Sequence, residues 1–589
     1  AVWIVQQYLF ILFIVWPPTV TISQGTVIGT VATDGYYYEF HGIPYADTTA
    51  GTNRFKAPLP PPSFPGPFVA NQKNIRCVRA LGVGFEGTEN CLVVNVFTPT
   101  LDTTRRLPVM VWIKGKEFDQ ANIPELSFRN FVVKEVVVVS LNYRESILGF
   151  LCLGTNIAPG NAGLKDIIAG LKWVQANIAQ FGGNPEDVTL FGHGSGAAAV
   201  DLVTLSPMGR GLVHKAIAQS GNALAPWAVT RDNLKYAIQV AEALGHEVTS
   251  TNQLSEIFTR SSVSALMGII NELDLTDNSL AFAPCVERHE LEDVEPFLTK
   301  TPAQIIRDAE FLRIPLIIGF VDNEGTIRAR EALEQNWPAR MENSFSDFIQ
   351  SDLTFETDAE KSAVAQSIRN FYFGENTIDM TQIANYIRYH GDTMILISSI
   401  REVRNRISAF ESPIYLYQFS YSGILGEHFV GPITVDSAAH SEELAYMFYN
   451  TPSTEINHRD FTIGEILVER WTNFAKTGNP TSQTSFVPWS PYTSSSLNFL
   501  RVLSDSEIIG SGIFELLLQN PHSVAINFWN DIYNDYFLDA ESDWEIDDGT
   551  TVPPTTEGST LTPLPPVPPP TDGSTTEPST DGGITEGHY

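Results

Sequence analysis

Basic residues are missing from the last part of this chain. No Lys or Arg follows Arg501, whereas sixteen Asp or Glu do, and the 589 residues contain 68 acidic and 36 basic side chains. The formal net charge of −32 argues against nucleic-acid binding, which depends on neutralising phosphates with Lys and Arg. Cationic protein partners are favoured, and divalent cations on the acidic surface are a second possibility.

Long hydrophobic runs are also missing. The apolar stretch at residues 8–16 is too short to span a bilayer. After the globular part there is no apolar stretch that is longer than this one. The stretch at 8–16 suits the apolar region of a secretory signal, so we expect residues 1–20 to be a signal peptide. The first residue is Ala1 and no basic residues precede the stretch, so this signal is expected to be truncated. The alternative is a buried N-terminal strand.

Cysteine is scarce, with four residues in the chain. In a secreted chain, Cys77 and Cys91 would close a short loop as a disulfide, which stabilises by about 3 kcal/mol in the chain-entropy model. Cys152 and Cys285 each lie in apolar surroundings. We expect them to be two separate buried thiols, with pairing as the alternative.

The pattern of apolar residues separates one large globular part from a tail. Apolar runs rich in β-branched residues at 109–113, 136–141 and 187–191 predict buried strands, and residues 161–181 have helical spacing. Alternating strands and helices predict a mainly parallel sheet covered on both faces, within one domain at residues 21–540.

Residues 541–589 are acidic and rich in Thr and Pro. They cannot bury enough apolar area to fold, so we expect a disordered and O-glycosylated stalk. The one near match to an N-glycosylation site, at residues 479–481, is blocked by Pro480.

Several motifs resemble those of type-B carboxylesterases and cholinesterases, in family order along residues 25–540. They are FHGIPYA at 40–46 followed by Arg54 and Phe55, TENCLVVNV at 88–96, PGNAGLKD at 159–166, QSG at 219–221 and WTNFAKTGNP at 471–480. The resemblance implies an α/β-hydrolase fold, with a large, mostly parallel central sheet flanked by helices. It also implies a structural ion pair between Arg54 and Glu89, and no cofactor or metal.

Ester hydrolysis on this fold needs a serine on a sharp strand-to-helix turn, a histidine base and a carboxylate that orients the histidine. When residues 191–198 (FGHGSGAA) are aligned on the family motif, the position of the serine holds Gly194. Ser195 lies one residue late, at the family's place for a small residue beside the oxyanion. The resemblance therefore implies that the nucleophile is absent.

The loop that holds the oxyanion in the family is altered as well. Residues 112–118 read WIKGKEF, where the family has Trp-Ile-His-Gly-Gly-Gly-Phe. Lys116 and Glu117 replace two glycines whose backbone approaches the substrate. Side chains there are expected to crowd the pocket or change the loop's dihedral angles.

The other two members of the triad match residues of this chain. Glu324 matches the acid and His440 the histidine. One interpretation makes them an active pair, and the other a retained hydrogen bond in an inherited core, which we expect. His193 is rejected as a substitute nucleophile, because its ring would project past the turn.

These observations predict a chain that is not an enzyme. The chain resembles the non-catalytic branch of the family, which includes glutactin, neurotactin, gliotactin and neuroligins. The function expected is that of a secreted protein of the extracellular matrix or basement membrane, or of cell adhesion, that binds unidentified extracellular proteins. Two alternatives stay open: a protein that sequesters a hydrophobic ligand, and a weak ester hydrolase that uses Ser195.

Overall fold

The computed structural model describes residues 16–47, 49–115, 127–275, 281–426, 429–430, 433–448, 456–482 and 487–539. Residues 1–15 of the predicted signal peptide and the whole predicted tail at 541–589 lie outside these ranges. The altered oxyanion residues Lys116 and Glu117 lie outside them too. The predictions made for these segments therefore stay predictions.

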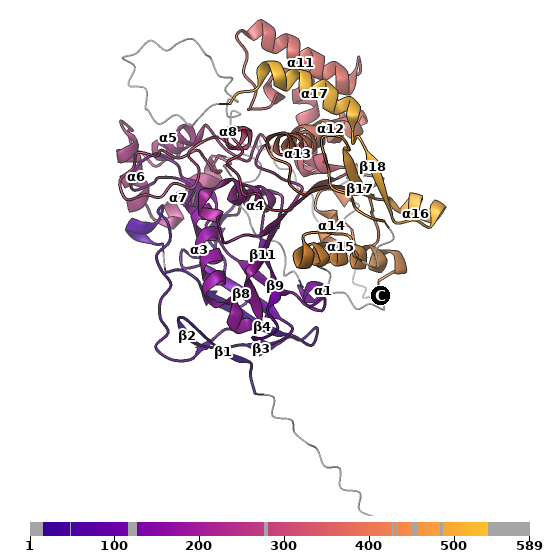
Figure 1. The fold of residues 1–589 in the computed structure, drawn as a ribbon. Coiled ribbons are helices and arrows are strands. Elements are labelled where there is room, and N and C mark those ends of the chain that lie inside the picture. Colours follow the sequence, from indigo (N-terminus) through magenta and orange to yellow (C-terminus); the bar gives the residue numbers. More distant parts are fainter. Residues whose placement is uncertain are drawn as a thin grey trace, which may run out of the picture. The chain divides into compact units, whose positions relative to one another are not determined.

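The centre of the fold is a sheet of eleven strands (Figure 1). Its strands, in spatial order, are β18 (Glu515–Gln519), β17 (Asn498–Val502), β14 (Ile414–Phe419), β13 (Leu316–Val321), β12 (Lys215–Gln219), β11 (Gly183–His193), β9 (Leu107–Ile113), β10 (Val137–Leu141), β8 (Val93–Thr98), β4 (Tyr38–Pro44) and β3 (Thr30–Val31).

The middle of this sheet is parallel and its two ends are antiparallel. Each neighbouring pair from β10 to β17 runs parallel, whereas β18 and the strands β8, β4 and β3 add antiparallel edges. In β9, Val109 and Val111 pack into one buried apolar cluster and Met110 and Trp112 into another. Because successive side chains of a strand point to opposite faces, an apolar run is buried on both sides.

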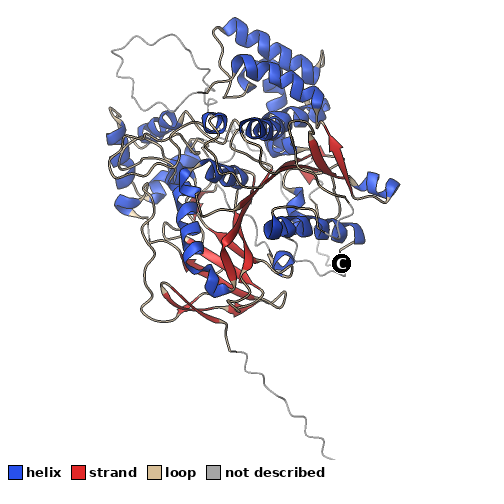
Figure 2. Cartoon of the chain, in the orientation of Figure 1, coloured by secondary structure: helices blue, strands red, loops and turns tan. Residues whose placement is uncertain are grey.

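Helices cover both faces of the sheet (Figure 1, Figure 2). Helices α3 (Ala162–Asn177) and α4 (Ser195–Leu205) contribute to the first apolar cluster, and α1 (Arg129–Val132) and α15 (His458–Thr477) to the second. The remaining α-helices are α2 (Ser146–Phe150), α5 (Asn233–Ala243), α6 (Thr251–Arg260), α7 (Val263–Glu272), α8 (Pro302–Arg307), α9 (Ala329–Glu334), α10 (Trp337–Asn343), α11 (Asp358–Phe373), α12 (Ile383–Gly391), α13 (Ile397–Ala409), α14 (Glu442–Met447), α16 (Asp505–Ser511) and α17 (Ser523–Tyr536).

Small sheets lie outside the main one. β1 (Thr19–Ile22), β2 (Gly25–Ile28) and β5 (Phe68–Val69) form a three-stranded sheet, and β15 (Phe429–Val430) pairs with β16 (Ile433–Thr434). A short hairpin joins β6 (Arg79–Ala80) to β7 (Phe85–Glu86).

The predicted fold class is confirmed: the structure is an α/β-hydrolase fold with a mostly parallel sheet between helices. Each of the three apolar runs forms a central strand, β9, β10 and β11, and the predicted helix at 161–181 is α3 followed by a 3-10 turn.

Candidate active site

Strand β11 and helix α4 are joined by the single residue Gly194. Its φ of 59° and ψ of −126° belong to a region that strains any side chain other than glycine's hydrogen. The turn is tight: a Cβ atom on Gly192 would lie 2.7 Å from the backbone of Gly196, and one on Gly196 would collide with the carbonyl of Ile113. This is the sharp strand-to-helix turn that presents a nucleophile in α/β-hydrolases, and Gly194 occupies its apex.

Space for a side chain remains at this apex. Among the residues that the structure describes, and apart from the two chain neighbours of Gly194, no atom lies within 4 Å of a Cβ atom built on this residue. The backbone N–H of Gly194 donates a 2.9 Å hydrogen bond to the carbonyl of Gln219 at the end of β12, which fixes the turn against the neighbouring strand. The turn therefore has the shape that presents a nucleophile, with glycine in place of the serine.

Ser195 is the first residue of α4 and is 2% exposed. Its Oγ atom is buried and has no hydrogen-bond partner among the described residues. A serine nucleophile needs a base within hydrogen-bonding reach, about 2.6–3.2 Å. Ser195 does not meet this condition in the structure.

His440 and Glu324 come from two segments far apart in the sequence. Glu324 follows β13, and His440 lies just before α14. The Nδ1 atom of His440 is 2.5 Å from Oε2 of Glu324, whose other oxygen accepts the N–H of Val321 at 2.8 Å. The backbone N–H of His440 donates to Oγ1 of Thr326 at 2.9 Å. A buried carboxylate that is itself held by the backbone thus orients the imidazole.

His193 places this pair beside the elbow. It is the last residue of β11, and its ring centroid is 4.8 Å from that of His440. Burial, followed by the proximity of His440, holds the pKa of His193 well below its usual value, so its ring is neutral near pH 7. The base of the family mechanism and the open apex therefore lie together.

Glu443 also belongs to this cluster, although sequence reasoning did not single it out. Its side chain is fully buried, and Oε1 is 3.8 Å from Nε2 of His193. Burial first, and then the charge of Glu324, raises the pKa of Glu443 to about 7. The motif at 439–444 that locates His440 already contains this residue, but the sequence does not show that it faces β11.

The raised pKa of Glu443 predicts a pH-dependent contribution to stability. A carboxyl whose pKa is higher in the folded than in the unfolded chain stabilises the fold below about pH 4.5, and this contribution is lost as the pH rises through 7. We expect the native chain to lose on the order of 2–3 kcal/mol relative to Glu443→Gln between pH 5 and 8. Urea unfolding of both proteins at these pH values measures the difference, and parallel pH profiles would contradict it.

The start of the oxyanion loop packs directly on the elbow. A Cβ atom on Gly115 would collide with the backbone of Gly196 and of His193, so only glycine fits there. The preceding residue, Lys114, is half-buried, and the loss of contact with water lowers the pKa of its ammonium group. Its Nζ donates a 3.2 Å hydrogen bond to Oδ1 of Asn142.

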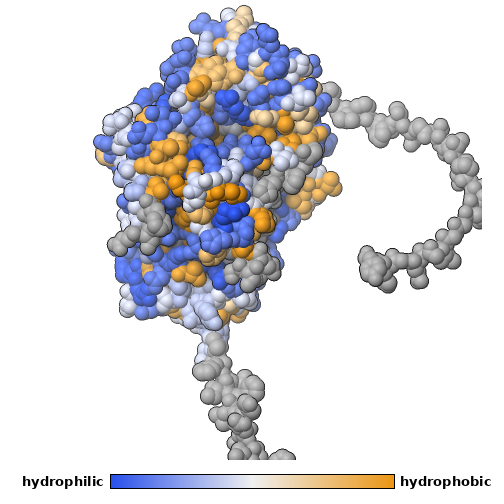
Figure 3. Space-filling view, turned by 90° about the vertical axis from the view of Figure 1, so that its right-hand side faces the viewer, coloured by the Kyte–Doolittle hydropathy of each residue, from blue (hydrophilic) through white to orange (hydrophobic). Residues whose placement is uncertain are grey.

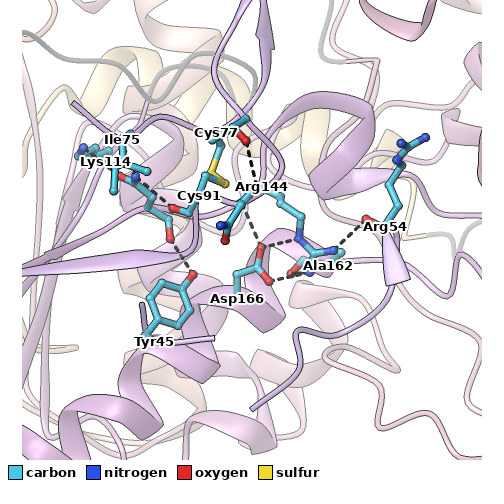
Figure 4. Close-up of a disulfide and its surroundings, with 12 residues drawn as sticks. Tyr45, Arg54, Ile75, Cys77, Cys91, Lys114, Arg144, Ala162 and Asp166 are labelled. Carbon is cyan, nitrogen blue, oxygen red and sulfur yellow. Dashed lines mark hydrogen bonds and ion pairs between the residues drawn. A yellow bond between two sulfur atoms is a disulfide. The ribbon is translucent and has the colours of Figure 1, made fainter. Parts of the chain in front are cut away.

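The disulfide between Cys77 and Cys91 lies close to this loop (Figure 4). The side-chain amide of Asn142 donates to the carbonyls of Ile75 and Cys91 at 2.8 and 3.2 Å, while its oxygen accepts from Lys114. One side chain thus ties the base of the disulfide loop to the start of the oxyanion loop.

Two buried ion pairs support the same region. Arg54 and Glu89 form a bidentate pair, with 2.7 and 3.1 Å between nitrogen and oxygen atoms. Arg144 pairs with the buried Asp166 at 2.6 Å and also donates to the carbonyls of Arg54 and Ala162 (Figure 4). The charges satisfy one another inside the fold, which is the condition for burying them.

The prediction that Cys152 and Cys285 are separate thiols is wrong. The structure joins them in a second disulfide, with Cα atoms 6.6 Å apart and 133 residues of sequence between them. Apolar surroundings do not distinguish a buried thiol from a buried disulfide, because both are apolar. Sequence alone gives no spacing signal for a cross-link of such long range.

Removing this long-range disulfide is expected to destabilise the chain more than removing the short one. In the chain-entropy model, loops of 133 and 14 residues correspond to about 5 and 3 kcal/mol. We therefore expect the double variant Cys152→Ala/Cys285→Ala to unfold at lower urea than Cys77→Ala/Cys91→Ala. The reverse order would show that local strain or packing outweighs loop closure.

Within the described ranges, no group of three or more His, Cys, Asp or Glu side chains is placed to hold a metal ion. No helix in the same ranges has the length and apolar character needed to cross a membrane.

Comparisons with known proteins agree on one family. A model described as "Carboxylesterase family" matches residues 17–521. Venom carboxylesterase-6 of Apis mellifera is 29% identical over 486 residues, which cover 79% of this chain and 86% of the relative. Bile salt-activated lipase of Homo sapiens is 28% identical over 576 residues, covering 91% and 73%.

A solved structure extends the likeness to three dimensions. The crystal structure of juvenile hormone esterase from Manduca sexta, with OTFP covalently attached, matches with a TM-score of 0.77 at 25% sequence identity. The match covers 88% of this chain and 100% of that one.

These relatives contradict the prediction that the chain is not an enzyme. All three are named as esterases or lipases, and the similarity covers most of this chain. The comparisons support the family and not its non-catalytic branch. The prediction rested on Gly194 at the nucleophile position and on Lys116 and Glu117 in the oxyanion loop. The elbow and the bonded His440 and Glu324 are nevertheless present.

Proposed function

Because this chain belongs to the carboxylesterase family, we propose that it hydrolyses carboxylic esters slowly, with water in place of the serine hydroxyl. The main support is an open apex beside an oriented base. Within the described part of the chain, no atom outside residues 193–195 lies within 4 Å of a Cβ position on Gly194. His440, held by Glu324 at 2.5 Å, lies against the residue that precedes this apex.

The proposed reaction has a single displacement. Glu324 binds Nδ1 of His440, so Nε2 is the nitrogen that accepts a proton from the water. The water oxygen bonds to the ester carbonyl carbon, and the carbonyl electron pair moves to its oxygen. When the tetrahedral intermediate collapses, the bond to the alcohol oxygen breaks and His440 returns the proton to the leaving alcohol. The products are a carboxylic acid and an alcohol, and no residue is acylated.

Backbone groups at the elbow are suited to hold the oxyanion. In α/β-hydrolases one donor is the N–H of the residue after the apex, which here is Ser195. As the first residue of α4, Ser195 presents an N–H that has no partner within the helix, at the positive end of the helix dipole. Gly115 brings the start of the oxyanion loop against the same turn.

The expected rate is low. Loss of a triad serine typically lowers turnover by about a million-fold, whereas general-base catalysis alone contributes about a hundred- to ten-thousand-fold. Turnover is therefore expected above the buffer reaction and far below that of a serine esterase.

The test is hydrolysis of 4-nitrophenyl acetate by the native chain and by Ser195→Ala. Equal turnover by the two proteins, above buffer, is expected if water attacks directly. Loss of turnover in Ser195→Ala would mean that Ser195 acts as nucleophile. Saturable ester binding without any product would replace the proposal with the ligand-sequestering alternative.

We also propose that the chain is secreted and binds extracellular proteins, in the matrix or basement membrane or in cell adhesion. Two disulfides support an oxidising compartment, and the net charge of −32 supports cationic partners. On the face shown in Figure 3, hydrophilic residues surround small groups of hydrophobic ones.

Binding to a lysine-rich peptide, compared with and without residues 541–589, tests this second proposal. We expect binding that weakens as salt rises from 50 to 500 mM, and that falls when the acidic segment is removed. Undetectable or salt-independent binding would contradict a cationic partner.

A further inference from the structure

The β6–β7 hairpin carries an exposed apolar tip inside the Cys77–Cys91 loop. The tip consists of Leu81, Val83 and Phe85, which are 46%, 91% and 40% exposed. In contrast, Val78 and Ala80 on the strand leading to the tip are 3% exposed and point inward. Single exposed apolar residues are common on protein surfaces, whereas a group of them can mark an interaction site. The three apolar side chains of this tip form such a group.

The tip is held in its shape before any partner arrives. Leu81 donates its N–H to the carbonyl of Gly84 at 3.2 Å, and Gly82 and Gly84 adopt positive φ values of 78° and 75°. From the side, the amide of Asn271 in α7 donates to the carbonyl of Gly84 at 2.8 Å. The disulfide closes the base of the loop. Little conformational entropy is therefore lost when the tip is covered.

The charges around the tip are unusual for so acidic a chain. No Asp or Glu occurs between Asp47 and Glu86, whereas five basic residues do. At the base of the hairpin, the guanidinium groups of Arg76 and Arg79 share the carboxylate of Glu86. The segment that forms the tip thus carries no carboxylate before Glu86. Arg76, whose side chain is 43% exposed, is the arginine of this pair that is placed to contact a phosphate group.

We propose that this apolar tip docks on a zwitterionic lipid surface, with Leu81, Val83 and Phe85 inserted and Arg76 at the level of the phosphates. The surface is zwitterionic because the net charge of −32 repels an anionic bilayer, while the local charge at the hairpin suits lipid phosphates. Short apolar insertions flanked by basic residues are a general mode of interfacial binding.

Docking at the tip would also orient the candidate active site. Asn142 connects the carbonyl of Cys91, at the base of the loop, to the side chain of Lys114, at the start of the oxyanion loop (Figure 4). The proposal does not depend on hydrolysis, since it concerns binding alone.

Flotation of the full chain with phosphatidylcholine vesicles tests the proposal. We expect the native chain to float with the vesicles and Val83→Asp to partition at least ten-fold more weakly, because a valine that inserts into the lipid is replaced by a charge. The matched control is Val524→Asp, at a valine on α17 that is 71% exposed; it should float like the native chain. Thermal unfolding of each variant checks that it is folded.

Three results would overturn this inference. The native chain could fail to float with phosphatidylcholine vesicles, or Val83→Asp could float as well as the native chain. Sedimentation velocity without lipid could instead reveal a dimer that Val83→Asp abolishes, and the occupant of the tip would then be a second copy of the chain.

Discussion

Gly194→Ser is expected to raise ester hydrolysis about a thousand-fold over the native chain. The new side chain enters space that is open in the structure, at the apex of an intact elbow and beside the bonded His440 and Glu324. Restoring a triad serine could return up to about a million-fold. Lys116 and Glu117 replace two glycines of the oxyanion loop, and the loss of one oxyanion donor typically costs about a hundred- to a thousand-fold.

The same variant should be less stable than the native chain. Gly194 has a φ of 59°, and a non-glycine residue in such a sparsely populated region costs of order 1–3 kcal/mol. Labelling by a fluorescent organophosphonate, which reacts with activated serines, gives the direct measurement. Gly194→Ser should be labelled and the native chain should not. Labelling of the native chain at Ser195 would show that Ser195, and not Gly194, occupies the nucleophile position of the family motif.

His440→Gln is expected to reduce turnover to that of the buffer. The native reaction, as proposed, depends on His440 to take a proton from water, and general-base catalysis contributes about a hundred- to ten-thousand-fold. Glutamine keeps a similar polar shape but cannot accept the proton. Steady-state hydrolysis of 4-nitrophenyl acetate measures the loss.

The control for this prediction is His193→Gln. Its ring packs 4.8 Å from that of His440 but is not assigned a proton-transfer step. We expect this variant to keep most of the native turnover. If His440→Gln were as active as the native chain, His440 would not be the base, and the hydrolysis would have to arise elsewhere on the protein.

The fold could be predicted from local patterns, because the spacing of apolar residues in a segment indicates which of its faces are buried. The apolar runs at 109–113 and 136–141 have no polar alternation, which requires a strand covered on both faces. The structure places them in β9 and β10, paired in parallel at the centre of the sheet. The elbow at position 194 was expected from the resemblance of residues 191–198 to the family motif, and the structure places a strand-to-helix turn there.

Features that depend on long-range proximity could not be predicted in the same way. Cys152 and Cys285 are 133 residues apart, and Glu443 meets His193 across two different elements. Neither contact can be recognised from the residues that flank its two members in the sequence. The activity was mispredicted for a different reason. Gly194 at the nucleophile position and the changes at Lys116 and Glu117 were taken to exclude hydrolysis, and the relatives named as esterases and lipases contradict this.

Intact-mass analysis of the native chain, quenched while it turns over an activated acetate ester, tests the central claim most directly. Direct attack by water predicts that acetate accumulates over many equivalents, while the mass of the protein stays unchanged. A 1:1 acetyl adduct that appears and decays at the turnover rate would contradict the account. Product formation no faster than in buffer would contradict it equally.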